Sequence, residues 1–139
     1  MGKGKAQAAF EYLVIVSIVL VFMIPIWAYV TTTQRDTSTE LTLTYAKNTA
    51  NQIADASNLV YSQGPPAKVK INVYVPHGVN NITILNNSIR FEVMVDSKIT
   101  DIFAFSTAQM NGTLSKKKGY YWIEVEAMDD TVQIKQSSS

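Results

Sequence analysis

The sequence predicts an α+β protein: a long amino-terminal helix, Pro-kinked and hydrophobic in its first half, followed by a small antiparallel β-sandwich-like domain. Three observations lead to this fold class. Residues 13–30 form a run without a single charge, and residues 45–60 repeat apolar side chains every three or four positions. From residue 68 onward, apolar and polar side chains alternate, as they do in half-buried strands.

The hydrophobic segment, residues 12–30, reads YLVIVSIVLVFMIPIWAYV. Its uncharged part would span roughly 27 Å as a helix, close to the hydrocarbon thickness of a bilayer. Pro25 removes one backbone hydrogen bond and is expected to kink the helix or loosen one turn. This segment is therefore either a membrane anchor or the apolar part through which copies of the chain polymerise.

The helix is expected to continue through the threonine-rich residues 31–44, held there by packing, because local propensity is poor. Beyond them one stripe combines Tyr45, Thr49, Gln52, Ile53, Ala56, Leu59 and Val60, and a face of small residues combines Ala46, Ala50, Ala54 and Ser57. Gly64-Pro65-Pro66 then stops the helix. The helix is thus predicted over residues 7–64.

The β-domain is predicted over residues 67–135, with six short strands and a polar tail over 136–139. Turns are expected at Asn86-Asn87-Ser88, Asn111-Gly112 and Asp129-Asp130. In the strand after Gly119, the side chains of Tyr121, Ile123, Val125 and Ala127 should point inward, and those of Tyr120 and Trp122 outward.

Composition indicates no enzyme. There is no Cys, the formal net charge is only +1, and the one histidine, His77, lies in a Pro-His-Gly turn without a second ligand at metal spacing. No phosphate-binding loop or nucleophile–base set is present. We expect no catalytic, cofactor-binding or metal-binding residues and no nucleic-acid partner. Lys116-Lys117-Lys118 is interpreted as a solvated hairpin loop or, alternatively, as a contact to anionic surfaces.

The residues before the apolar run carry a recognisable pattern. A small residue, Ala6, precedes Gln7, and Glu11 and Tyr12 stand fifth and sixth counted from that glutamine. This arrangement resembles the class III signal peptide of archaeal type IV pilins, in which a prepilin peptidase cuts before the glutamine. The resemblance covers about residues 1–30. Ala9 departs from the serine that is usual in that motif.

The resemblance implies a structural subunit of an extracellular filament, used for surface adhesion or cell–cell contact. Residues 1–6 would be a cleaved leader, and copies of the chain would polymerise through the helix. Glu11, Tyr12 and Pro25 would act in assembly, with Glu11 paired to the new α-amine of a neighbouring subunit. The implied partners are a prepilin peptidase and an assembly ATPase with its membrane platform.

Lys3 and Lys5 place the amino terminus of the membrane-inserted precursor in the cytoplasm by the positive-inside rule, so that the remainder is exported. Sequons for N-glycosylation begin at Asn81, Asn86 and Asn111, at or near predicted turns. Two alternatives remain open. One is an archaellin, the subunit of a motility filament, and the other is a single-pass, membrane-anchored surface binding domain that never polymerises.

Overall fold

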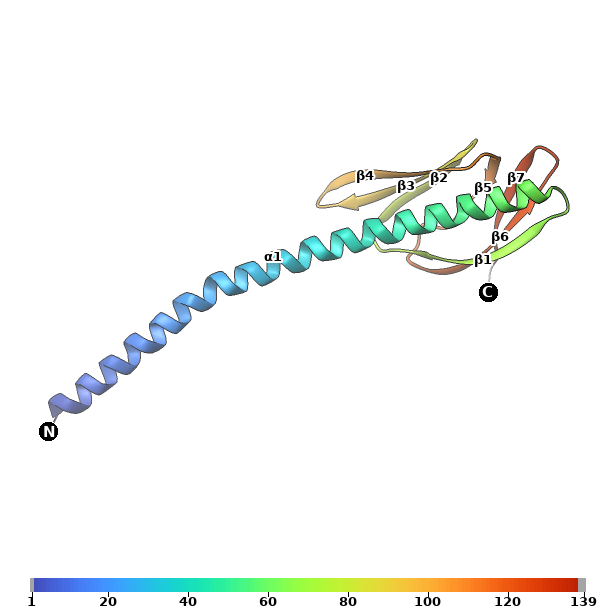
Figure 1. The fold of residues 1–139 in the computed structure, drawn as a ribbon. Helices are drawn as coiled ribbons and strands as arrows, with labels where there is room; N and C mark the ends of the chain where they lie inside the picture. The colour runs from blue at the N-terminus through green and yellow to red at the C-terminus, as the bar shows by residue number, and fades with distance from the viewer. Residues whose placement is uncertain (1, 138–139) are drawn as a thin grey trace. The chain divides into compact units, whose positions relative to one another are not determined.

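The computed structural model describes residues 2–137, which fall into two units, residues 2–38 and 39–137. Helix α1 spans Gly2–Gln63 and is followed by seven strands (Figure 1). The strands are β1 (Lys68–Val75), β2 (Val79–Leu85), β3 (Ser88–Val95), β4 (Lys98–Phe105), β5 (Gln109–Gly112), β6 (Gly119–Ala127) and β7 (Thr131–Ser137). The predicted α+β class is confirmed.

Helix α1 begins at Gly2 and therefore includes most of the segment expected to be a leader. It continues through Pro25, because losing one backbone hydrogen bond does not outweigh those of the neighbouring turns. The helix ends where the sequence predicted a stop. Gly64 adopts φ +74° and donates its N–H to the carbonyl of Val60 at 3.0 Å, a termination that suits a residue without a Cβ.

The strands form two sheets, one in the order β1-β6-β7-β5 and one in the order β2-β3-β4. All pairs are antiparallel except β5 and β7, which run parallel. The turn expected at Asn111-Gly112 is wrong, because both residues belong to β5, a strand absent from the predicted six. A glycine is needed at position 112 because the backbone of β7 lies very close to β5 there. A Cβ at this position would lie 2.2 Å from the carbonyl oxygen of Ile134 on β7.

The hairpin expected at Asn86-Asn87-Ser88 is present and joins β2 to β3. Asn86 adopts φ +50° in the turn between β2 and β3, a conformation that Asn tolerates well. Along β3, the side chains of Ile89, Phe91 and Val93 are fully buried, and the residues between them are partly exposed. The alternation predicted for this strand is therefore confirmed.

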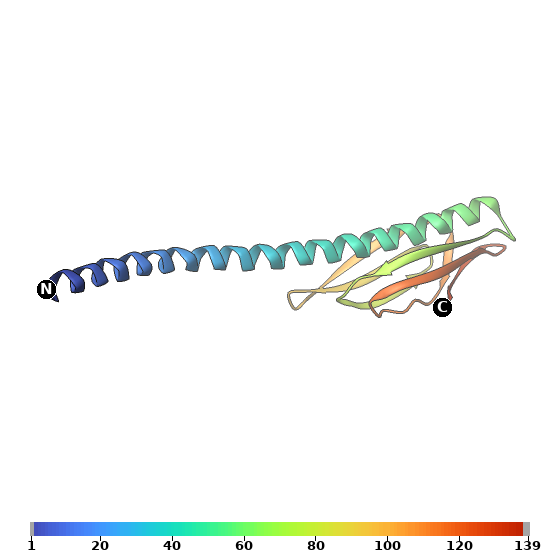
Figure 2. The same cartoon turned by 90° about the horizontal axis from the view of Figure 1, so that it is seen from below.

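One core joins both sheets to the part of α1 that follows residue 39, which lies along them in Figures 1 and 2. The buried helix residues are Ala46, Thr49, Ala50, Ile53, Ala54, Ala56, Ser57 and Val60. All four residues of the small-residue face are buried, and their short side chains let the helix approach the strands closely. The predicted stripe is correct only in part, because Tyr45, Gln52 and Leu59 are exposed.

The helix also caps a strand edge. Strand β1 is the edge of its sheet, and the hydroxyl of Thr49 donates a hydrogen bond to the backbone carbonyl of Tyr74. A covered strand edge is a poor template for pairing with other chains. Along β6, Ile123, Val125 and Ala127 are buried and Tyr121 is partly buried, whereas Tyr120 and Trp122 are exposed, as predicted.

Candidate functional site

The hydrophobic segment of residues 12–30 exposes large apolar side chains all around α1. Leu13 is 62% exposed, Phe22 66% and Trp27 76%. By length and composition α1 can cross a membrane, and its most apolar stretch is not buried within its own unit, residues 2–38. A continuous apolar surface of this size requires lipid or protein around it, because contact with water is unfavourable by about 25 cal/mol per Å².

Five serine and threonine hydroxyls within and after this segment donate hydrogen bonds to carbonyls of the same helix. Ser17 donates to the carbonyl of Leu13 at 2.7 Å, and Thr31, Thr32, Thr33 and Thr37 donate to carbonyls three or four residues earlier. An unpaired hydroxyl in an apolar medium costs several kcal/mol, so these bonds make the segment compatible with lipid or a dry helix bundle.

The expected cleavage junction and the glutamate lie on consecutive turns of α1. The amide Nε2 of Gln7 donates to Oε1 of Glu11 at 3.3 Å, a contact between positions i and i+4. Both residues are exposed, as are Ala6 and Tyr12. Glu11 is the only carboxylate residue before Asp36. A carboxylate therefore stands at the border of the hydrophobic segment and accepts a hydrogen bond from a residue of its own helix.

Comparison with known proteins adds no further assignment: no protein-family model, no curated protein and no solved structure matches this chain. The functional reading consequently depends on the residues of the chain themselves.

The three sequon asparagines are exposed, but only Asn86 lies in a turn. Asn81 lies in β2, next to an irregularity in its pairing with β3, and Asn111 lies in β5. Within its sequon, Asn81 donates from Nδ2 to Oγ1 of Thr83 at 3.3 Å. Asn86 is therefore the position most accessible to a modifying enzyme on steric grounds.

Charged side chains gather on the outer face of the four-stranded sheet. Nζ of Lys68 lies 3.1 Å from Oε1 of Glu124 and 3.7 Å from Oε1 of Glu126, and Lys70 and Lys135 approach the same two carboxylates. The hydrogen bond between Lys68 and Glu124 raises the pKa of the lysine and lowers that of the glutamate. This network joins β1, β6 and β7, and its three lysines and two glutamates leave a formal net charge of +1.

The remaining polar positions singled out in the sequence, His77 and the three lysines, do not come together with one another in a single site. Among residues 2–137, no group of three or more His, Cys, Asp or Glu could hold a metal ion, and His77 lies exposed in the turn between β1 and β2. Lys116-Lys117-Lys118 is exposed as expected. The hairpin expected there is wrong, because β5 and β6, which this loop connects, are not neighbours in the sheet.

Proposed function

We propose that this chain is the structural subunit of an extracellular, type IV pilus-like filament. It is cut between Ala6 and Gln7, and its copies polymerise through the hydrophobic segment of α1. The single observation that carries this proposal is the exposure of that segment on every side, directly after the Gln7–Glu11 pattern. The β-domain forms the outer shell, where it serves adhesion or cell–cell contact.

The hydrophobic segment suits two environments in succession. In the membrane its side chains contact lipid, and in the filament they contact the same segment of other copies. Lipid tails are as apolar as leucine side chains, so moving the helix from one environment to the other gains little hydrophobic free energy. Extraction therefore needs an external energy source, and an assembly ATPase is the expected partner. Once outside, release of a subunit would expose the segment to water, which keeps the filament together.

Glu11 fixes the axial position of each subunit relative to its neighbour in the filament. An ionised carboxylate in an apolar helix bundle costs several kcal/mol unless a positive charge meets it. Cleavage before Gln7 creates an α-amine, a group with an ordinary pKa of about 8, and this amine on a neighbouring copy is the complement. The bond from Gln7 within the same helix satisfies only part of the carboxylate. Such head-to-tail contacts do not close, so they extend into a helical filament.

A non-polymerising anchor is the second candidate. The same observation favours it, because a segment exposed on all sides is equally suited to permanent residence in lipid. In that case residues 31–137 would be a tethered binding domain outside the cell. The two functions differ in one respect: only the filament needs the α-amine and the carboxylate to meet.

The test is to express wild-type, Glu11→Ala and Glu11→Gln chains in cells that carry a prepilin peptidase and an assembly machine. Cleavage is followed by intact mass and filaments by electron microscopy. We expect all three to be cleaved and both variants to lose filaments. Glu40→Gln, which removes an exposed carboxylate of α1 outside the hydrophobic segment, is the matched control and should assemble normally. Abundant normal filaments from Glu11→Ala would contradict the role of Glu11, and wild-type protein that remains monomeric in membranes would favour the anchor.

A further inference from the structure

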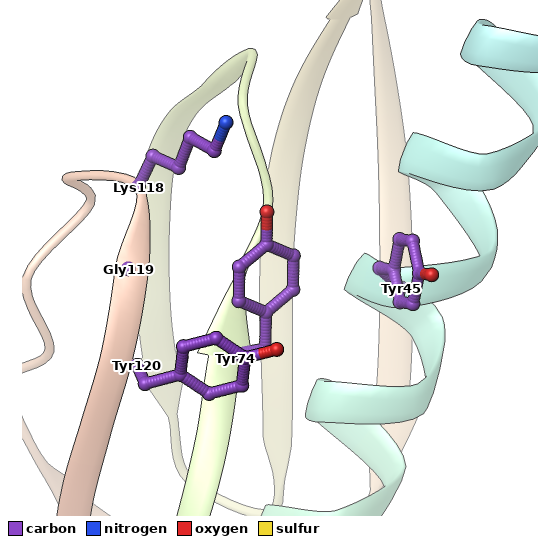
Figure 3. Close-up of a pocket in the computed structure, with 5 residues that line it drawn as sticks. All are labelled: Tyr45, Tyr74, Lys118, Gly119 and Tyr120. Atoms are coloured by element: carbon purple, nitrogen blue, oxygen red, sulfur yellow. The ribbon is translucent and has the colours of Figure 1, made fainter.

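Three tyrosines from distant parts of the chain line one pocket of the β-domain (Figure 3). Tyr45 comes from α1, Tyr74 from the end of β1 and Tyr120 from the start of β6, and Lys118 and Gly119 complete the lining. The rings of Tyr45 and Tyr74 meet edge to face with centroids 5.5 Å apart, and those of Tyr74 and Tyr120 lie 4.8 Å apart at 43°. We call this site the tyrosine pocket.

The tyrosine pocket remains open to a ligand. Tyr120 is 74% exposed and Tyr45 47% exposed, so their rings are not buried in the core. Trp122, half exposed, lies on the same face of β6 as Tyr120, because residues two apart along a strand point to the same side. The volume of about 480 Å³ falls within the range typical of small-ligand sites.

The chemistry of the lining narrows the class of ligand. Aromatic faces offer flat apolar contact, and each tyrosine hydroxyl both donates and accepts hydrogen bonds. A sugar ring has the complementary surface, with an apolar C–H face and a rim of hydroxyls. A proline-rich peptide also docks on aromatic side chains, but it extends along a groove rather than filling one hollow. The pocket is lined by five residues, which is a short surface for an extended peptide, and it therefore favours a saccharide.

Lys118 sets the charge preference. Its side chain stands beside the rings in Figure 3, and none of the five lining residues is acidic. Aromatic pockets attract cations in general, but an ammonium group in the same pocket repels them. Lys116 and Lys117 precede it in the same exposed loop. The positive charge favours a ligand that carries a carboxylate.

We propose that the tyrosine pocket binds an acidic saccharide, a uronate-containing glycan whose ring stacks on Tyr120 and whose carboxylate meets Lys118. This goes beyond the filament proposal, because it gives the β-domain a ligand of defined chemistry whether or not the chain polymerises. It needs only that the pocket faces the medium outside the protein.

The test uses the full-length chain in detergent and two probes, a hyaluronan tetrasaccharide that contains glucuronate and neutral cellotetraose. Binding is followed by titration calorimetry and by intrinsic tryptophan fluorescence, to which Trp122 on the face of the pocket and Trp27 both contribute. We expect saturable binding of both oligosaccharides, tighter for the uronate. Tyr120→Ala should weaken both by roughly 3- to 10-fold. Lys118→Gln should reduce affinity for the uronate alone, by about 5-fold or more.

The matched control is Tyr61→Ala, which removes a tyrosine of α1 that is 43% exposed and lies outside the pocket. This control should bind both probes like the wild type, and thermal unfolding should show that all three variants are folded. The proposal is overturned if neither oligosaccharide binds saturably, if a proline-rich peptide binds instead, or if Tyr120→Ala and Lys118→Gln bind like the control. Because monomers are measured, these outcomes are independent of whether filaments form.

Discussion

The side-chain carbonyl oxygen of Asn58 on α1 accepts a hydrogen bond from the hydroxyl of Ser106, 2.8 Å away in the segment between β4 and β5. The same oxygen accepts the backbone N–H of Thr107 at 2.8 Å and its hydroxyl at 2.9 Å. One amide thus fastens the helix to a loop of the β-domain that lies far along the chain. Ser106 is buried, so water cannot easily replace this partner.

Replacing Asn58 by Ala should destabilise the β-domain by about 1–3 kcal/mol, because the buried hydroxyl of Ser106 loses its acceptor. Urea unfolding of the detergent-solubilised chain measures the change. Asn51→Ala, at an exposed helix position, is the control and should stay within about 0.5 kcal/mol of the wild type. Equal stability of the two variants would mean that the Asn58 contact does not contribute to the free energy of unfolding.

Gly112→Ala should prevent β5 from pairing correctly with β7. The new Cβ would lie 2.2 Å from the carbonyl oxygen of Ile134, so the strands must move apart, at a cost of at least about 1–3 kcal/mol. Thermal unfolding and amide hydrogen exchange of β5 are the measurements. Gly4→Ala, which meets nothing within 4 Å, is the matched control. Unchanged protection of Met110 and Asn111 in Gly112→Ala would contradict the observed pairing.

Local pattern predicted much of this fold, because each correct prediction depended on near neighbours in the sequence. The alternation of Ile123, Val125 and Ala127 indicates a strand with one buried face, and Gly64-Pro65 ends a helix for steric reasons alone. The amino-terminal pattern, in which Gln7 and Glu11 precede an uncharged run, could also be recognised from the spacing of these residues in the sequence. The structure adds that the run is exposed on all sides.

The errors arose where contacts distant in sequence decide the outcome. Asn111-Gly112 has the composition of a turn, yet Gly112 is needed because β7 approaches so closely, and no local signal reveals a parallel partner. The tyrosine pocket was missed for a similar reason. Tyr45, Tyr74 and Tyr120 belong to three elements, and only the fold brings their rings together. The outward direction of Tyr120 was the one available signal.

The stability of the β-domain should depend on pH through Lys68 and Glu124. The pKa of Glu124 is lowered from 4.5, so its stabilising effect is present above that value and disappears as pH falls through the folded-state pKa. The pKa of Lys68 is raised from 10.5, so its effect is present below that value and disappears as pH rises through the folded-state pKa.

The free energy of unfolding of Glu124→Gln should therefore fall below that of the wild type near neutral pH, and the difference should shrink in both acid and strong alkali. Urea unfolding at several pH values measures this difference. Asp129→Asn, in the exposed turn between β6 and β7, serves as the control. A difference that does not vary with pH would show that the ion pair has no part in stability. Added salt should also reduce this difference in the free energy of unfolding, since the groups are partly exposed.

Phe91 and Phe105 lie on opposite faces of the three-stranded sheet. Phe91 is fully buried, and truncation to Ala should cost about 3–5 kcal/mol through lost contacts and a cavity. Phe105 is 70% exposed and stacks on Phe103, so Phe105→Ala should change stability by less than about 0.5 kcal/mol. Comparable losses from both variants, measured by urea unfolding, would be inconsistent with the described burial.

The amino-terminal mass of protein sheared from the cell surface tests the central proposal most directly. If the chain is a processed filament subunit, the filament fraction contains copies whose first residue is Gln7, with Glu11 retained. Recovery of the protein only from the membrane fraction, with Lys3 and Lys5 still attached, would contradict the proposal and identify the hydrophobic segment as a permanent anchor.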